Sequence, residues 1–176
     1  MNTDRYVITA AHCLPSTPPA QSENFETLYK NLLGPLGEEP TVWADCLFVD
    51  LVADIAVLGS PDNQSLYKQA EAYEELTNNG LPLRIANFPE QCDGWLLSLD
   101  KDWFRCKASR CFERGPIWIE DAKQGIVGGT SGSPIINTKG HAIGVLTCSA
   151  GCGDEPHTKS GPSPSLVGNL PGWFVQ

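Results

Sequence analysis

Residues 128–148 read GGTSGSPIINTKGHAIGVLTC, a glycine-rich turn followed by two apolar segments that meet at Lys139-Gly140. Two apolar segments separated by such a short, turn-forming link predict a β-hairpin. Ser131 stands inside the preceding turn and is followed directly by Gly132. Glycine beside a serine lets the backbone approach a ligand closely and turn its N–H groups inward. The stretch therefore predicts an antiparallel β protein with an exposed serine turn.

The rest of the chain supports the same fold class. We expect strands over 5–13, 41–50, 55–58, 81–88, 94–99, 103–108 and 116–121. Helical spacing of apolar residues predicts helices over 24–34 and 62–79, whereas the Pro-, Gly- and Ser-rich segments 14–23 and 150–165 are expected to be loops. Short strands at this spacing favour an all-β antiparallel barrel or sandwich with one or two short helices over alternating βαβ units.

Composition narrows the possible classes of protein. The chain of 176 residues suits one domain or two packed subdomains, and its 41% of hydrophobic residues is enough to form a core. A net charge of −9 argues against nucleic-acid binding, which needs basic patches. No apolar run approaches the ~20 residues of a membrane helix, so no membrane partner is expected. We expect no cofactor.

Seven cysteines leave at least one thiol without an internal partner. The short-loop pairs Cys148–Cys152 and Cys106–Cys111 are the easiest disulfides to form, but connectivity does not follow from sequence. Finger-type spacing of cysteine and histidine pairs is missing, so no metal site is predicted. Disulfides, a metal site and reduced buried thiols remain as alternatives.

Ser131 is a candidate nucleophile. A serine hydroxyl reacts slowly at neutral pH unless a base takes its proton and donors stabilise the developing negative charge. The N–H groups of Gly129 and Ser131 are candidates for that oxyanion hole. A phosphate-binding loop is the competing function, but no lysine follows the glycines and no helix pattern lies behind them. An ordinary turn is the other alternative.

His12 and Asp54 are the candidate partners of Ser131. His12 follows an apolar strand in TAAHC (9–13), and imidazole exchanges protons near neutral pH. Asp54 is the single carboxylate in the apolar run ADIAVL (53–58), where burial without a partner is costly. A histidine N–H is a suitable partner, and the pair would fix the tautomer that a general base needs. A structural histidine and a turn-forming aspartate are the alternatives.

Together the three motifs, in the order His, Asp, Ser, resemble the trypsin-like, or chymotrypsin-fold, serine peptidases, with a likeness closest to the bacterial forms. The resemblance extends over 5–148. It implies two antiparallel β-barrels, a first over 1–80 carrying His12 and Asp54 and a second over 81–176 carrying Ser131. It also implies a serine endopeptidase that hydrolyses protein or peptide substrates through an acyl-enzyme, in an extracytoplasmic or secreted location.

The chain departs from the family pattern before His12. Family members have two strands ahead of the histidine motif, so we expect an incomplete first barrel with an unpaired edge. The resemblance also implies that Cys13 lacks its usual upstream partner. Two alternatives follow: an inactive fragment or pseudoprotease that binds proteins, and an esterase that uses the same three residues.

The resemblance to the family also predicts how the protein is activated. Thr130 stands where zymogens carry the aspartate that pairs with a new N-terminus, so we expect activation without that ion pair. His141 and His157 are expected to lie on the surface.

The resemblance also places the substrate pocket. Its base would be Gly125, and its walls would be Thr147, Cys148 and Ser149. Leu146 stands where glutamate-cutting relatives carry histidine. A small or apolar side chain is therefore expected at the cleavage site.

Overall fold

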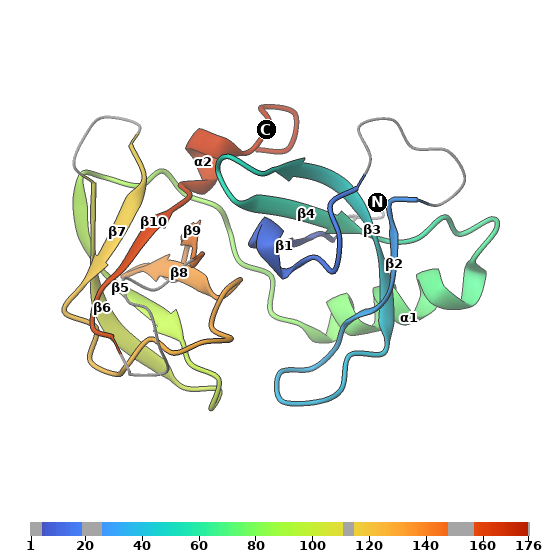
Figure 1. Cartoon of the computed structure of the whole chain (residues 1–176), viewed down its shortest axis with the longest axis horizontal. Helices are drawn as coiled ribbons and strands as arrows, with labels where there is room; N and C mark the ends of the chain where they lie inside the picture. The colour runs from blue at the N-terminus through green and yellow to red at the C-terminus, as the bar shows by residue number, and fades with distance from the viewer. Residues whose placement is uncertain (1–4, 19–25, 111–114, 148–156, 176) are drawn as a thin grey trace.

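The computed structural model describes residues 5–18, 26–110, 115–147 and 157–175. Most of the regular structure is β, in two antiparallel sheets that lie side by side, with the helix α2 (Leu166–Asn169) above their junction (Figure 1). The helix α1 (Tyr67–Asn79) and the short 3-10 helix η1 (Ala11–Cys13) belong to the first half. The predicted all-β class with short helices is therefore confirmed. None of the described helices is long and apolar enough to cross a bilayer.

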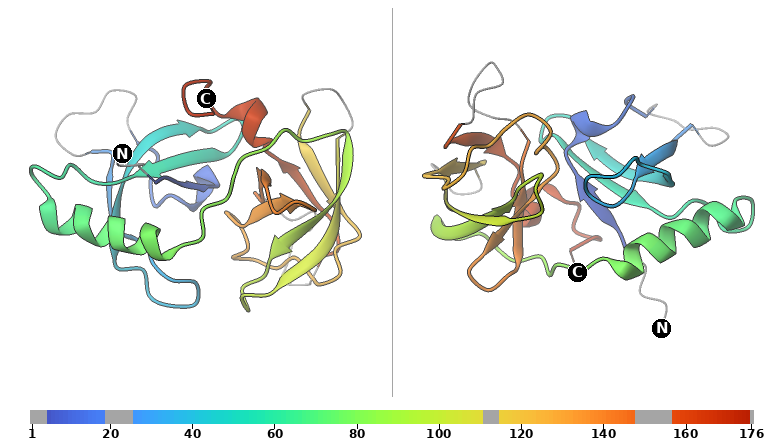
Figure 2. Two further views of the ribbon diagram at one scale, coloured as in Figure 1. Left: turned by 180° about the vertical axis from the view of Figure 1, so that it is seen from behind. Right: turned by 90° about the horizontal axis from the view of Figure 1, so that it is seen from below.

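The first sheet has the strand order β1-β4-β3-β2. Its strands are β1 (Val7–Thr9), β2 (Leu28–Leu33), β3 (Val42–Asp50) and β4 (Ile55–Gly59). Every residue of β4 is buried, since this strand lies in the middle of the sheet, and α1 packs along β3 (Figure 2). Within the described residues β1 and β2 form the two edges, as expected for an incomplete first barrel.

The second sheet has six strands in the order β10-β7-β6-β5-β8-β9. These are β5 (Gln91–Leu97), β6 (Trp103–Arg110), β7 (Ile117–Glu120), β8 (Pro134–Asn137), β9 (Ala142–Val145) and β10 (Ser160–Ser163). Burial alternates along β6 and β7, so one face of each strand packs inward. An antiparallel bridge between Gly144 of β9 and Ser165, which directly precedes α2 and lies two residues after β10, brings the two ends of the sheet together, so the sheet curls toward closure.

A shared apolar cluster holds the two halves together. It combines buried residues of the first sheet, the second sheet and α2: Ile55, Val57, Ala142, Val145, Leu166 and Leu170. Near the C-terminus Phe174 packs against the same cluster, and its ring lies 5.2 Å from that of Tyr6. Because this cluster includes β4 and β9, burial of apolar surface fixes the two sheets relative to each other.

Three expected elements differ from the structure. The segment predicted as a helix over 24–34 contains strand β2, because Tyr29 is buried against Ala44 of β3 and pairing with β3 overrides the helical spacing. The segment 81–88 is a connector rather than a strand, with one isolated bridge from Ile85 to Ala142. Within the expected loop 150–165, residues Ser160–Ser163 form β10.

The cysteines are also only partly as expected. Cys106 is a buried free thiol in β6, so the suggested Cys106–Cys111 disulfide is wrong. Desolvation raises the pKa of the Cys106 thiol to about 12. The other suggested pair, Cys148–Cys152, lies outside the described residues.

Candidate active site

His12 and Asp54 form a doubly hydrogen-bonded pair on the first sheet. The ring Nδ1 of His12 lies 2.7 Å from Asp54 Oδ2, and the His12 backbone N–H donates to Asp54 Oδ1 at 2.9 Å. The carboxylate therefore accepts from both the ring and the main chain of the same residue. Such a pair holds the ring orientation and keeps the proton on Nδ1, which leaves Nε2 as the basic nitrogen.

Local backbone geometry brings these two residues together. His12 lies in η1, one turn after the end of β1, and Asp54 lies in the tight turn between β3 and β4. Asp54 has a φ of 55°, a left-handed conformation that aspartate tolerates better than most residues. The N–H of Ala11 donates to the Asp54 carbonyl at 3.2 Å, so side chain and backbone of Asp54 both fix the segment that carries His12.

The serine turn lies on the second sheet, immediately before β8. Gly129 and Gly132 flank it with φ values of 90° and 87°, which only glycine adopts without strain. Thr130 is buried, and its hydroxyl donates to the Val127 carbonyl at 2.7 Å. The turn is thus closed by a neutral internal hydrogen bond.

The Ser131 hydroxyl donates its hydrogen bond to the carbonyl of Thr147 at 2.9 Å. A hydroxyl has one proton to donate, so in this structure that proton is not directed at His12. Thr147 follows strand β9 by two residues, and the sequence placed it in a pocket wall without predicting this contact. The structure therefore joins His12 to Asp54 and Ser131 to Thr147, as two separate pairs.

The two candidate oxyanion donors are present in the turn. Neither the N–H of Gly129 nor that of Ser131 has a hydrogen-bond acceptor among the residues that the structure describes. By contrast, the next two N–H groups are used: that of Gly132 donates to the Leu146 carbonyl at 2.8 Å, and that of Ser133 donates to the Thr130 carbonyl at 3.0 Å. The turn therefore leaves the N–H groups of Gly129 and Ser131 available to a ligand.

The predicted pocket residues fall partly within the described chain. Gly125 is half-buried, and Thr147 is buried with its hydroxyl donating to the Pro162 carbonyl at 2.7 Å. Cys148 and Ser149 lie outside the described residues.

The two remaining histidines differ from the expected surface position. His141 is half-buried and directly precedes β9, and its backbone N–H donates to Asn137 Oδ1. His157 is also half-buried, and its Nε2 is fully buried. The prediction missed this because His157 follows a Gly- and Pro-rich segment that carries no strand pattern.

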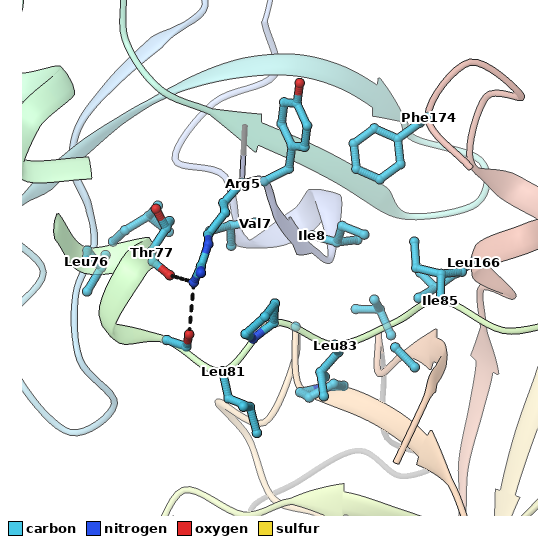
Figure 3. A pocket seen from close by; sticks show the side chains of 18 of the residues that line it. Arg5, Val7, Ile8, Leu76, Thr77, Leu81, Leu83, Ile85, Leu166 and Phe174 are labelled. Carbon is cyan, nitrogen blue, oxygen red and sulfur yellow. Dashed lines mark hydrogen bonds between the residues drawn. The ribbon is translucent and has the colours of Figure 1, made fainter. Parts of the chain in front are cut away.

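A separate cavity of about 690 Å³ lies between the two halves (Figure 3). Val7 and Ile8 of β1, Leu83 and Ile85 of the connector, and Leu166 of α2 contribute to its largely apolar wall. His12, Asp54 and Ser131 are not among its lining residues. The cavity therefore does not coincide with the candidate catalytic residues, although the turn after Ser131 borders it.

In the described part of the chain, no group of three His, Cys, Asp or Glu side chains is placed so that it could hold a metal ion.

The solved structures that resemble this chain include two proteases. One is a human pathogenic astrovirus serine protease, with 14% identity and a TM-score of 0.48 over 93% of this chain and 80% of that one. The other is the Rv3671c protease in its inactive form, with 19% identity and a TM-score of 0.47 over 82% of this chain and 68% of that one. No family model and no curated protein matches the sequence.

Proposed function

We propose that this protein is a serine endopeptidase in which Ser131 is the nucleophile, His12 the general base and Asp54 the residue that orients it. The observation that carries the proposal is the paired contact of Asp54 with both the ring and the backbone of His12. A surface histidine without a catalytic role needs no such double restraint. The serine turn with two available N–H donors adds the second half of an acyl-transfer site.

The reaction begins with a rotation of the Ser131 side chain. Its hydroxyl leaves the Thr147 carbonyl and turns its proton toward His12 Nε2. The Thr147 carbonyl then accepts the N–H of the substrate residue whose carbonyl carbon Ser131 attacks, since that N–H lies close to the nucleophile. Substrate binding therefore favours the reactive position of Ser131.

Acylation and deacylation then follow from the positions of the groups. Ser131 Oγ attacks the scissile carbonyl carbon while its proton passes to His12 Nε2. The oxygen becomes negative and accepts from the N–H groups of Gly129 and Ser131. His12 gives its proton to the leaving amine as the C–N bond breaks, and the acyl group stays on Ser131. A water molecule, deprotonated by His12, releases the acid and restores the serine.

The second candidate function is an inactive protein-binding module. The contact that favours it is the bond from Ser131 to Thr147, because a serine held there does not react. In that case the His12–Asp54 pair is a remnant of catalysis, and the Ser131 hydroxyl stabilises the turn instead.

Labelling with a fluorophosphonate probe separates the two functions. We expect one adduct on Ser131, found by peptide mass mapping, which is abolished in Ser131→Ala and strongly slowed in His12→Ala. Ser133→Ala is the matched control, since the structure uses the backbone of Ser133, and it should label like the parent protein. A folded sample that stays unlabelled would overturn the peptidase function. Cleavage of a denatured protein substrate, lost in Ser131→Ala, then distinguishes a peptidase from an esterase.

A further inference from the structure

The cavity between the two halves of the molecule has few polar groups in its wall. Among the described residues that line it, Arg5 is the only charged one, and Tyr6 and Thr77 are the only others with polar side chains. The rest of the wall consists of glycine, proline and apolar side chains. A largely apolar cavity with a few polar groups is the usual form of a small-molecule site, and about 690 Å³ is a usual size for one.

The charged and the apolar parts of the wall lie at opposite ends of the cavity. Figure 3 shows Arg5 and Thr77 at one end, beside the C-terminus of α1, and Leu166 and Phe174 at the other end. Leu83 of the connector lies between these two ends. A ligand that fills the cavity therefore meets a cation at one end and mainly apolar side chains along the rest of its length.

The guanidinium group of Arg5 keeps part of its hydrogen-bonding capacity. Its Nη1 donates to the carbonyls at the end of α1, to that of Thr77 at 2.7 Å and that of Gly80 at 3.2 Å, with the Asn78 carbonyl at 3.5 Å. Within the described part of the chain, Nε and Nη2 have no hydrogen-bond acceptor, and no carboxylate forms an ion pair with Arg5. A guanidinium carries five N–H donors, so the three on Nε and Nη2 are available to a ligand.

The positive charge of Arg5 is only partly offset by the protein. The C-terminus of a helix carries roughly half an elementary negative charge, whereas the guanidinium carries a full positive one. The chain as a whole has a net charge of −9, but no Asp or Glu is among the described residues that line the cavity. Two neighbouring guanidinium nitrogens match the two oxygens of a carboxylate. This end of the cavity therefore favours a carboxylate.

We propose that the cavity binds a fatty acid, with the carboxylate on Nε and Nη2 of Arg5 and the hydrocarbon chain running along Leu83 toward Leu166. A hydrocarbon chain needs no hydrogen-bond partner, whereas a peptide segment brings N–H and C=O groups that apolar side chains leave unsatisfied. None of the three candidate catalytic residues lines the cavity, so this site goes beyond the proposed peptidase function and does not depend on it.

Ligands with one chain length and different head groups test the proposal on the parent protein. Dodecanoate, 1-dodecanol and dodecylammonium are titrated by calorimetry at neutral pH, each below the concentration at which it forms micelles. We expect one site per chain and an affinity for dodecanoate about tenfold or more above that for 1-dodecanol, as for hydrogen bonds to a charged group. Dodecylammonium should bind most weakly. Decanoate and octanoate should lose about fourfold in affinity for each CH₂ removed.

Variants at Arg5 assign the head-group contact. Arg5→Gln should weaken dodecanoate about tenfold or more and leave 1-dodecanol unchanged, whereas a general loosening of α1 would weaken both ligands. Arg5→Lys keeps the charge but loses the paired donors, so its affinity for dodecanoate should lie between those of the parent and Arg5→Gln. Lys139→Gln is the matched control. It removes an exposed positive charge outside the cavity and should bind dodecanoate like the parent protein.

Leu83→Trp tests the location of the site without changing Arg5. The larger side chain occupies part of the cavity, so the affinities for dodecanoate and 1-dodecanol should both fall while circular dichroism shows an intact fold. Unchanged affinity in this folded variant would place the ligand elsewhere and overturn the proposal. Equal affinity of the parent protein for dodecanoate and 1-dodecanol would overturn the role of Arg5, and with it the choice of a fatty acid. Absence of saturable binding to the parent protein would overturn the site itself.

Discussion

The backbone of Gly132 lies so close to Thr9 that a Cβ at residue 132 would stand 2.5 Å from Thr9 Oγ1. Thr9 ends β1, three residues before His12, and Gly132 directly follows Ser131. The contact therefore joins the segment that carries the proposed base to the turn that carries the proposed nucleophile. The two halves of the molecule, which supply different parts of the proposed site, meet here where the Gly132 backbone approaches the Thr9 side chain.

Replacing Gly132 with alanine should disrupt this alignment. The φ of 87° costs an alanine about 1–2 kcal/mol, and the contact with Thr9 adds to that. We expect a lower melting temperature and a much slower fluorophosphonate reaction. Gly140→Ala is the matched control, because Gly140 has a φ of 74° and nothing within 4 Å of an added Cβ. The control should be destabilised by the strain alone and should label at the parent rate.

A second substitution separates strain from collision. Thr9→Ala removes Oγ1 and leaves the Thr9 Cβ position 3.7 Å from the added atom, an ordinary contact. Combined with Gly132→Ala it should restore part of the labelling rate without recovering the stability lost to backbone strain. If the double variant labels no faster than Gly132→Ala alone, the contact with Thr9 does not set the alignment.

Asp54→Asn should cost about 10⁴-fold in kcat if the His12–Asp54 pair acts as in trypsin-type serine peptidases. An asparagine oxygen still accepts the His12 backbone N–H, whereas its amide nitrogen toward Nδ1 favours the wrong ring tautomer. The fold should therefore change little, which circular dichroism and thermal melting check. Steady-state hydrolysis of a peptide substrate measures the loss. A decrease smaller than tenfold contradicts an orienting role for Asp54.

We expect the hydroxyl of Thr130, rather than the shape of its side chain, to stabilise the turn that carries Ser131. Thr130→Val keeps the volume but removes the 2.7 Å bond to the Val127 carbonyl inside a buried turn, a change worth about 1–3 kcal/mol. We expect lower stability and slower labelling of Ser131. Thr130→Ser retains the donor and should stay close to the parent protein in both measurements. Equal behaviour of the valine and serine variants would mean that this bond does not hold the turn.

Cys106 should make the protein less stable at high pH. Burial raises the pKa of its thiol from 9.0 to about 12, so the folded state holds a proton that the unfolded state releases above pH 9. The contribution of this thiol to the free energy of unfolding is complete below pH 9 and is lost as the pH rises from 9 toward 12. Between pH 8 and 11 the free energy of unfolding should fall by up to about 3 kcal/mol from this group.

Urea unfolding of the parent protein and Cys106→Ala at several pH values isolates that contribution. The variant loses some stability at pH 8 because a buried side chain is shortened, so the slopes with pH are compared rather than the absolute values. Cys106→Ala should show the shallower decline. Tyr73, whose pKa is also raised by burial, contributes equally to both proteins. Identical slopes would show that the pKa of the Cys106 thiol does not differ between the folded and unfolded states.

Much of the fold could be predicted from local pattern. The hairpin of β8 and β9, the strands β5, β6 and β7, and the helix α1 all follow from periodicity and turn residues, because these elements carry their signal within ten residues or so. Strand β2 was mistaken for a helix because its leucines also fit helical spacing. The neighbour that decides the matter, β3, is a partner in space rather than a local signal.

For the candidate site, too, some features follow from the sequence and others only from the tertiary structure. Residue types, spacing and order in the sequence determined that His12, Asp54 and Ser131 are the candidates, since each motif is local and carries its own reason. Only the tertiary structure decided how these groups are paired: Asp54 with the ring and backbone of His12, and Ser131 with Thr147. It also decided that His157 is half-buried, with an Nε2 that has no hydrogen-bond partner among the described residues. Hydrogen bonds and desolvation depend on atoms that are distant in sequence and meet only when the sheets curl and pack, so no local pattern encodes them.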